Sequence, residues 1–349
     1  MTMHKPVMLR EVLEYLDPKP NQNFIDCTFG GGGHATAILE RIGQAGLLLA
    51  IDADSQILKN VKCQMSNVKC VNDNFRSLKS IYANNFPYPV SGILLDLGLS
   101  SMELDDETRG FSFLKDGPLD MRFDKAKQEL TAGEVLNKYT LDNLVKIFTE
   151  YGEVPIGRAR QVAKAVVETR RRRRMETSFD FVAVILQAFY PGAFARGKIS
   201  VTTRDFYHHR KKITHPATQF FQALRVEVNG ELASLKLVLP QAMDILETGG
   251  RLAVIAFHSL EDRIVKKFFK ESVHGDSPTL RLLTKKPVAP TLEEIADNPR
   301  SRSAKLRVAE KRHENTRPPR KRERCGQAWL GNPDAVSFLS LSRSRLPAP

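Results

Sequence analysis

The stretches Phe-Ile-Asp-Cys-Thr-Phe-Gly-Gly-Gly-Gly-His at residues 24–34 and Leu-Leu-Leu-Ala-Ile-Asp-Ala-Asp at residues 47–54 decide the fold of this 349-residue chain. An apolar run stops at four consecutive glycines, a helical pattern follows over residues 34–41, and a second apolar run ends on Asp52. This succession of strand, glycine loop, helix, strand and acidic residue is the first half of a nucleotide-binding βαβ unit. The sequence therefore predicts an α/β fold built on a Rossmann-like sheet.

The glycine loop and Asp52 together predict an adenosine-type ligand at one edge of that sheet. Glycines let backbone N–H groups approach a ligand closely, and Asp52, nineteen residues after Gly33, can accept hydrogen bonds from both ribose hydroxyls. The loop lacks the last glycine of G-x-G-x-x-G, and the chain contains no G-x-x-x-x-G-K-[ST]. Asp26, shortly before the loop, can hold a cationic amino group, which favours S-adenosylmethionine over NAD.

The composition indicates which kind of partner the protein binds and in which compartment it is located. The formal net charge of +13 is typical of proteins that bind a polyanion, and it also fits a basic enzyme whose lysines are solvated. The four cysteines show no C-x-x-C pair and no histidine at zinc spacing, which predicts reduced thiols, no metal and a cytoplasmic location. The apolar runs are too short to span a bilayer, and charges in the first helix argue against a signal peptide.

Further buried runs extend the sheet beyond the first two strands. Strands are predicted at residues 68–72, 90–97 and 251–257, and residues 280–284 and 305–309 are expected to form a hairpin at one edge. Asp96-Leu97-Gly98-Leu99-Ser100-Ser101 closes the fourth strand at the carboxyl edge, where open α/β sheets bind ligands. Phe75 follows the third strand and either lies against an adenine ring or packs in the core.

Helices are predicted between these strands, and in a long segment that interrupts them. Asp54 is expected to cap a helix reaching residue 65, and Gly249-Gly250 to end a helix over residues 231–247. Residues 105–214 carry helical patterns without a convincing buried strand, for example at 141–151 and 156–168. We therefore expect a methyltransferase-like sheet domain at residues 1–104 and 215–312, an inserted all-helical domain at 105–214 for substrate recognition, and a basic, disordered tail at 313–349.

Several motifs occur together in the order typical of one family. They are Thr28-Phe29-Gly30 with Gly32-Gly33-His34, Asp96-Leu97-Gly98-Leu99-Ser100-Ser101, Arg109-Gly110-Phe111-Ser112-Phe113, Gly117-Pro118-Leu119-Asp120-Met121-Arg122, His215-Pro216-Ala217-Thr218 and residues 257–266, Phe-His-Ser-Leu-Glu-Asp-Arg-Ile-Val-Lys. Over residues 4–312 the chain resembles the bacterial 16S rRNA cytosine N4-methyltransferases (RsmH/MraW). The tail after residue 313 has no counterpart in this resemblance.

The resemblance implies a class I S-adenosylmethionine-dependent methyltransferase with a helical insertion. It implies methyl transfer to N4 of a cytosine in the decoding region of 16S rRNA. The sequence leaves open whether free rRNA or the 30S subunit is the form bound, with the 30S subunit as the expectation, and whether the protein is a homodimer. By position, the cofactor residues would be Gly32, Gly33, His34, Asp52, Phe75 and Asp96. The family's Ser-Ser-x-Gln is Ser100-Ser101-Met102-Glu103 here, so Glu103 keeps the acceptor and loses the amide donor.

The residue that accepts a hydrogen from the cytosine amino group is left open. Many amino-methyltransferases place Asp/Asn-Pro-Pro-Tyr after the fourth strand, and this chain has neither the proline pair nor the aromatic there. The candidates are a backbone carbonyl of the loop, Asp96, Ser100 and Asp120, although Asp120 can equally form an ion pair with Arg122. His258 is interpreted as structural, at the entrance of a helix capped by Ser259 with Asp262 three residues later.

The predicted RNA surface lies in the insertion. Five consecutive arginines, without acids between them, repel one another unless an anion is near, and guanidinium groups suit phosphates. The RNA-binding candidates are Arg170, Arg171, Arg172, Arg173, Arg174, Arg210, Lys211 and Lys212. Two other functions remain open: an amino-methyltransferase acting on DNA or another RNA, and a ribosome-assembly factor that binds the cofactor without turnover.

Overall fold

The computed structural model describes residues 5–60, 66–208, 211–274 and 279–312. The chain divides into two compact units, residues 1–316 and 317–349, and the second unit lies outside the described residues. The predicted disordered tail, the predicted helix end at residue 65 and Arg210 all fall outside the described part of the chain. No helix in that part is long and apolar enough to cross a membrane.

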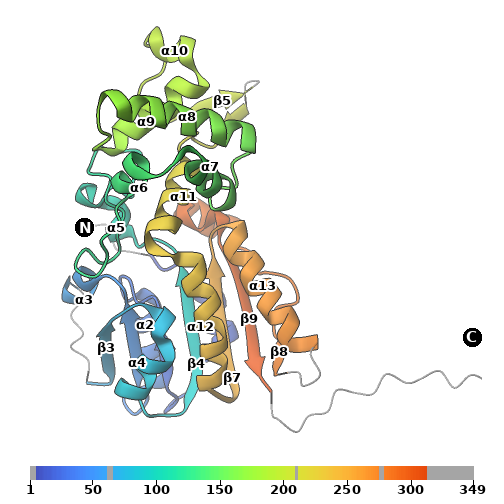
Figure 1. The fold of residues 1–349 in the computed structure, drawn as a ribbon. Helices are drawn as coiled ribbons and strands as arrows, with labels where there is room; N and C mark the ends of the chain where they lie inside the picture. Colours follow the sequence, from blue (N-terminus) through green and yellow to red (C-terminus); the bar gives the residue numbers. More distant parts are fainter. Residues whose placement is uncertain (1–4, 61–65, 209–210, 275–278, 313–349) are drawn as a thin grey trace, which may run out of the picture. The chain divides into compact units, whose positions relative to one another are not determined.

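A seven-stranded sheet forms the framework, with strand order β3-β2-β1-β4-β7-β9-β8 (Figure 1). The first five of these strands are parallel, and β9 is antiparallel to both of its neighbours. The strands are β1 (Phe24–Asp26), β2 (Leu48–Asp52), β3 (Val68–Asn72), β4 (Val90–Leu97), β7 (Leu246–Ala256), β8 (Leu280–Leu282) and β9 (Lys305–Lys311). The predicted sheet and its edge hairpin are confirmed.

Two hydrophobic layers cover the two faces of this sheet, because alternate residues of each buried strand point to opposite sides. In β2, for example, Leu49 and Ile51 pack with one set of helices, and Leu48 and Ala50 with the other. The first set, on the near side in Figure 1, is α4 (Leu78–Asn85), α12 (Glu231–Ile245) and α13 (Ser259–His274). The second is α1 (Leu9–Leu16), α2 (Gly33–Ile42) and α3 (Ser55–Asn60).

The segment between β4 and α12 has a hydrophobic core of its own, which extends from Phe111 to Val228. Its elements are α5 (Ser101–Asp105), α6 (Ala132–Lys138), α7 (Leu141–Glu150), α8 (Ile156–Arg172), α9 (Ser178–Phe189), α10 (Pro191–Ala195), β5 (Phe206–His208), β6 (Lys211–Ile213) and α11 (Thr218–Asn229). The prediction of an all-helical insertion is therefore wrong in one place, because β5 and β6 form a short antiparallel pair among the described residues of this segment. The domain boundaries at 105 and 214 stay a prediction.

Two local predictions are wrong. Helix α12 ends at Ile245, and Gly249-Gly250 lie within β7, where the pairing with β4 shifts register between Val90 and Gly92. A Cβ on Gly250 would lie 3.0 Å from the Val90 carbonyl oxygen, and Gly249 has φ +83°, so this pair forms a strand irregularity. In addition, Cys70 is disulfide-bonded, although the cysteine spacing predicts reduced thiols.

Candidate active site

A cavity of 780 Å³ opens at the carboxyl edge of the parallel strands, within the usual range of about 300–1,000 Å³ for ligand pockets. The order of the sheet reverses between β1 and β4, and in open α/β sheets ligands bind beside such a switch point. The lining residues that follow the strands include Thr28, Gly30, Gly31, Gly33, Asp52, Phe75, Asp96, Gly98, Ser100, Phe257 and Glu261. Most of the sequence-predicted loop therefore meets Asp52 and Asp96 in one cavity, whereas Asp26 is buried behind the lining.

The glycine loop turns tightly between β1 and α2. Gly30 and Gly32 have φ of +52° and +75°, in the left-handed region that favours glycine. Gly33 opens α2, and a Cβ there would lie 3.0 Å from the ring of Pro6. Gly33 lines the cavity, and Gly32 supplies the turn that brings the loop to it.

Asp52 ends β2 with its carboxylate directed at the glycine loop. Its Oδ2 accepts a hydrogen bond from Gly30 N at 2.8 Å, and its Oδ1 accepts one from Asp54 N at 2.8 Å. Each carboxylate oxygen has a second lone pair, so Asp52 can still accept from a ligand hydroxyl. Burial raises the pKa of Asp52 to about 6, despite these two hydrogen bonds, which lower it.

Asp96, at the end of β4, is the least satisfied acid of the cavity. Its backbone N–H donates to Thr28 Oγ1 at 2.7 Å, but its buried Oδ1 has no hydrogen-bond partner among the described residues. Burial first, and then the nearby charges of Asp26 and Glu261, raise the pKa of Asp96 to about 8. An uncompensated carboxylate in a cavity is suited to a cation or to a hydrogen-bond donor from a ligand.

Asp26 and His34 flank Asp96 from the glycine-loop side. Asp26 accepts from Thr28 N at 3.0 Å, and burial raises the pKa of Asp26 to about 7. His34 Nε2 lies 2.9 Å from the Val7 carbonyl oxygen, which can only accept, so Nε2 carries a hydrogen. His34 Nδ1 lies 3.6 Å from Asp96 Oδ2. The His34 ring therefore lies beside Asp96, in the first turn of α2.

Glu103 has a local structural task as well as a place in the cavity wall. Its Oε2 accepts from Ser100 N at 2.8 Å while Ser100 Oγ accepts from Glu103 N at 3.2 Å, which is the capping box of α5. Burial raises the pKa of Glu103 to about 8. Because Ser100 Oγ already accepts from a backbone N–H, Ser100 is the weaker candidate for an acceptor of ligand hydrogens.

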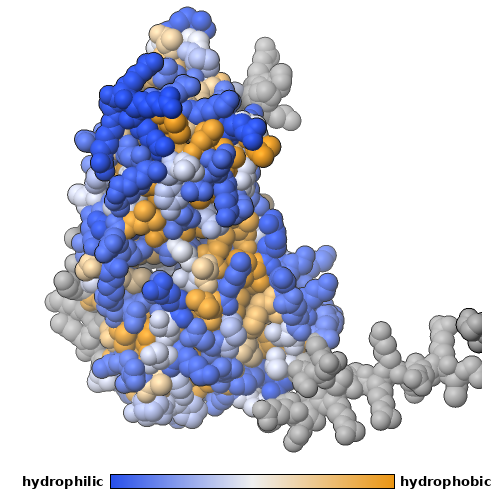
Figure 2. All heavy atoms as spheres, in the orientation of Figure 1, coloured by the Kyte–Doolittle hydropathy of each residue, from blue (hydrophilic) through white to orange (hydrophobic). Residues whose placement is uncertain are grey.

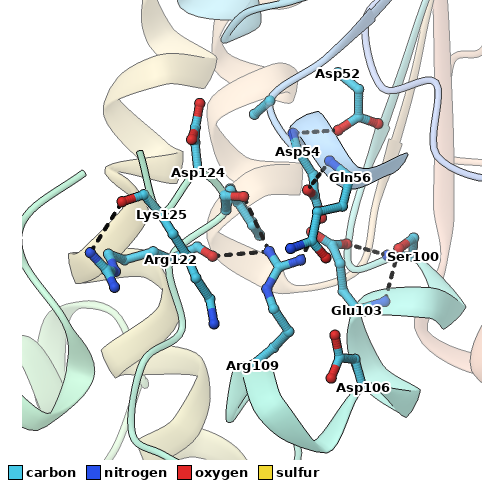
Figure 3. Close-up of polar contacts among 12 residues, drawn as sticks. Asp52, Asp54, Gln56, Ser100, Glu103, Asp106, Arg109, Arg122, Asp124 and Lys125 are labelled. Atoms are coloured by element: carbon cyan, nitrogen blue, oxygen red, sulfur yellow. Dashed lines mark hydrogen bonds and ion pairs between the residues drawn. The ribbon is translucent and has the colours of Figure 1, made fainter. Parts of the chain in front are cut away.

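A buried arginine that the sequence analysis did not single out connects the cavity loops to the insertion. Arg109 Nη1 lies 2.5 Å from Asp54 Oδ2, and its Nη2 donates to the carbonyls of Arg122 and Phe123 at 3.0 and 3.1 Å. Figure 3 shows this guanidinium between the turn after Asp52 and the segment of the insertion that carries Arg122. Its signal in the sequence is its position in the Arg-Gly-Phe-Ser-Phe motif, without any indication of its partners.

Asp120 lies apart from the cavity lining. Its carboxylate accepts from Arg122 Nε at 2.7 Å and from Arg122 Nη2 at 3.0 Å, and Lys125 Nζ lies 3.4 Å away. The pKa of Asp120 is lowered because the hydrogen bonds from Arg122 outweigh the opposing effect of burial. This geometry favours the ion-pair interpretation over a catalytic one.

The entrance of α13 differs by one residue from the prediction. Glu261 Oε2 accepts from Phe257 N at 2.8 Å and from His258 N at 3.2 Å, and His258 Nδ1 accepts weakly from Glu261 N at 3.5 Å. His258 therefore occupies the cap position, and the prediction that Ser259 caps with Asp262 is wrong. Asp262 instead pairs with Arg307 at 2.7 Å. The structural interpretation of His258 fits this arrangement.

The arginine run lies at the end of α8 and divides into two groups. Arg170 Nη1 donates to the Leu136 carbonyl at 2.8 Å, and Arg173 Nη2 pairs with Asp180 Oδ1 at 2.8 Å. Arg171, Arg172 and Arg174 are exposed. Figure 2 shows strongly hydrophilic residues over the helices of the insertion, at the top of the view. Lys211 and Lys212 lie on β6, next to Arg210, which is outside the described residues.

The sheet order, the glycine loop and the acidic edge, together with a match to a methylase family model, define a class I S-adenosylmethionine-dependent methyltransferase. The chain belongs to the MraW methylase family, whose model matches residues 1–312.

Curated relatives match along most of this chain. "Ribosomal RNA small subunit methyltransferase H" of Dehalococcoides mccartyi (strain ATCC BAA-2266 / KCTC 15142 / 195) is 43% identical over 325 residues, which are 88% of this chain and 86% of the relative. The protein of the same name in Thermomicrobium roseum is 43% identical over 328 residues, 89% of this chain and 94% of the relative. A solved rRNA methylase from Streptococcus thermophilus aligns with a TM-score of 0.36 and 12% identity, covering 87% of this chain and 94% of that chain.

Proposed function

We propose that this chain transfers the methyl group of S-adenosylmethionine to N4 of a cytosine in the decoding region of 16S rRNA. The proposal rests on one observation above the others: relatives named ribosomal RNA small subunit methyltransferase H match it at 43% identity over 88–89% of its length. The nucleotide and the atom come from the family resemblance. The acidic cavity supplies a chemical reason for an amino group as the acceptor of the methyl.

The cofactor residues follow from the cavity. The loop of Gly32, Gly33 and His34 would hold the methionine part, and Asp52 the ribose hydroxyls. Phe75, half-buried beside β3, would lie against the adenine, and Glu103 would border the same end of the cavity. When bound, the cofactor supplies an electrophilic methyl group on a cationic sulfur. Carboxylates kept out of water favour a cation strongly, because the low local dielectric increases their attraction for it.

Asp96 is the proposed acceptor for a hydrogen of the cytosine amino group. The lone pair of this nitrogen is delocalised into the ring, so the nitrogen becomes a better nucleophile when an acceptor holds one of its hydrogens. Asp96 Oδ1 is a buried oxygen without a partner among the described residues, and it belongs to the cavity wall. A positioned acceptor of this kind contributes roughly 10²–10⁴-fold to a rate. In-line placement of the nitrogen on the methyl group contributes further.

The RNA would bind through the exposed arginines of the insertion, Arg171, Arg172 and Arg174, and through Lys211 and Lys212 of β6. Arg210, which precedes them in the sequence and lies outside the described residues, is a further candidate. Arg170 and Arg173 are held by Leu136 and Asp180, so their share in phosphate binding would require these contacts to open. The partner is 16S rRNA, in the 30S subunit, and the compartment is the cytoplasm, where ribosomes assemble. The homodimer is a further proposal, and so is the division into a sheet domain and a recognition insertion.

Incorporation of labelled methyl groups tests this function. The protein is incubated with methyl-labelled S-adenosylmethionine and, in parallel, 30S subunits, naked 16S rRNA and duplex DNA, all free of the modification. We expect label in the ribosomal samples and none in DNA. Label in DNA alone would show that the substrate is DNA and not ribosomal RNA. Tight cofactor binding without label in any sample would contradict methyl transfer and favour a binding factor.

A further inference from the structure

Four phenylalanines line the cavity, and their environments differ. Phe29 is buried at 8% exposure, and Phe123 stacks on Phe111 with ring centroids 5.7 Å apart. Phe75 follows β3, and Phe257 follows β7. Since β3 and β7 lie on opposite sides of the β1–β4 switch point, Phe75 and Phe257 belong to opposite sides of the cavity.

Phe257 lies directly against the loop that follows β4. Leu97 and Ala256 are register partners in the parallel pair β4–β7, so Gly98 and Phe257 leave the sheet side by side. A Cβ on Gly98 would lie 2.9 Å from the Phe257 ring, so the ring packs on the bare backbone of this glycine. The ring therefore stands next to the residue pair Asp96–Leu97, close to the proposed hydrogen acceptor.

The backbone of Phe257 is held in place by the start of α13. Its N–H donates to Glu261 Oε2 at 2.8 Å, and the same oxygen accepts from His258 N. The ring is only partly buried and forms part of the cavity wall. A partly buried aromatic ring on a fixed backbone, in the same cavity wall as an unpartnered carboxylate oxygen, is suited to a flat ligand that carries a hydrogen-bond donor.

We infer that Phe257 is the platform on which the target cytosine stacks, with its amino group directed toward Asp96. The inference rests on the proposed function and assigns the half of the cavity between β4 and β7 to the base. The half between β1 and β3 remains for the cofactor. Phe257 thus supplies, from a different strand, the aromatic surface that the loop after β4 lacks. Stacking on an aromatic ring is the usual way in which proteins hold a base taken out of its own stack.

Substitutions at Phe257 separate a stacking ring from a packing side chain. Phe257→Leu keeps an apolar side chain without the aromatic face, and Phe257→Tyr keeps the face. Methyl transfer to 30S subunits is measured under single-turnover conditions, together with S-adenosylmethionine affinity and thermal unfolding. For Phe257→Leu we expect kcat/KM for the RNA to fall about 5- to 150-fold, the equivalent of roughly 1–3 kcal/mol per stacked base, with cofactor affinity unchanged. Phe257→Tyr should retain the activity.

A second variant tests the position of the ring without altering it. Gly98→Ala places a methyl group where the Phe257 ring lies and should displace it, so methyl transfer should fall in the wild-type background and much less in Phe257→Leu. The inference is overturned if Phe257→Leu is as active as the wild type, or if Phe257→Tyr loses as much as Phe257→Leu. A wild-type protein that methylates no RNA would instead contradict the proposed function itself, and the inference with it.

Discussion

The cavity at the sheet edge and the exposed end of α8 carry opposite charges in opposite surroundings. In the cavity wall, burial raises the pKa values of Asp96 and Glu103 to about 8, and behind the wall it raises the pKa of Asp26 to about 7. At the C-terminal end of α8, arginines are exposed to water, and the side chain of Arg173, which follows the helix, is 63% exposed even in its ion pair.

Buried acids cost folding free energy, which a bound cation offsets, whereas exposed arginines cost little and are screened by salt. The first arrangement fits a small cationic cofactor that is enclosed, and the second fits a polyanion that approaches from solvent.

The largest effect is expected at Asp96. Asp96→Asn keeps the shape of the side chain but removes the charged acceptor, so kcat should fall by about 100-fold or more. Because the raised pKa leaves Asp96 protonated in acid, the wild-type single-turnover rate should rise as the pH increases toward about 8, and the variant should lack this dependence. Ser100→Ala is the matched control, with a small expected loss. A larger loss in Ser100→Ala than in Asp96→Asn would reverse the assignment.

Asp52→Ala should have the next largest effect, on the cofactor alone. It removes a charged acceptor for the ribose hydroxyls, each hydrogen bond being worth roughly 1.5–3 kcal/mol before relaxation. Since about 1.4 kcal/mol corresponds to a tenfold change in affinity, S-adenosylmethionine affinity, measured by calorimetry, should fall at least about tenfold. The substitution also removes the hydrogen bonds from Gly30 N and Asp54 N. Circular dichroism and thermal unfolding of the variant are therefore the required controls, and they should show that it remains folded. Unchanged affinity would contradict the ribose assignment.

Substitutions in the exposed arginines should weaken RNA binding and leave the affinity for the cofactor unchanged. Replacing Arg171, Arg172 and Arg174 with alanine should flatten the slope of log affinity against log salt by about 0.7–0.9 for each lost phosphate contact. The matched control replaces the exposed lysines of α13, Lys266, Lys267 and Lys270, which removes the same charge from the other part of the molecule. Equal slopes in the two triple variants would mean that the α8 end contributes only general charge.

The smallest effect is expected for Glu103→Gln, and it concerns stability. Glutamine can also complete a capping box, and it is the usual family residue, so cofactor binding should persist. The pKa of Glu103 is raised in the folded state, so its stabilising effect is present below its unfolded pKa and is lost as the pH rises through about 8. The variant lacks this titration, so its melting temperature relative to wild type should increase from pH 6 to pH 9. A constant difference would contradict the raised pKa.

The sequence predicts the parts of this molecule that depend on local pattern. Apolar runs and the glycine loop give the strands that carry Asp52 and Asp96, because buried parallel strands are almost entirely apolar. The parts it misses depend on contacts between distant residues. Arg109 meets Asp54 across 55 positions, and a motif gives no sign of this partner.

Local patterns can also carry two meanings, and packing decides between them. The helix entrance at residues 257–262 contains two overlapping cap patterns, and the packing of Asp262 against Arg307 selects the one with Glu261. Glycine pairs serve helix ends and strand irregularities alike, which explains the misplacement of Gly249-Gly250. The role of Glu103 in the α5 cap is visible in Ser-x-x-Glu, although the family pattern directs attention to the cofactor.

The identity of the methylated nucleoside tests the central claim most directly. After reaction of the wild-type protein with methyl-labelled cofactor and unmodified 30S subunits, the RNA is digested to nucleosides and separated against synthetic standards. The account predicts that the label appears in N4-methylcytidine, and that Asp96→Asn loses it even at cofactor concentrations that saturate the variant. Label in 5-methylcytidine or in a methylated purine would contradict the assignment of an exocyclic cytosine nitrogen to the cavity beside Asp96.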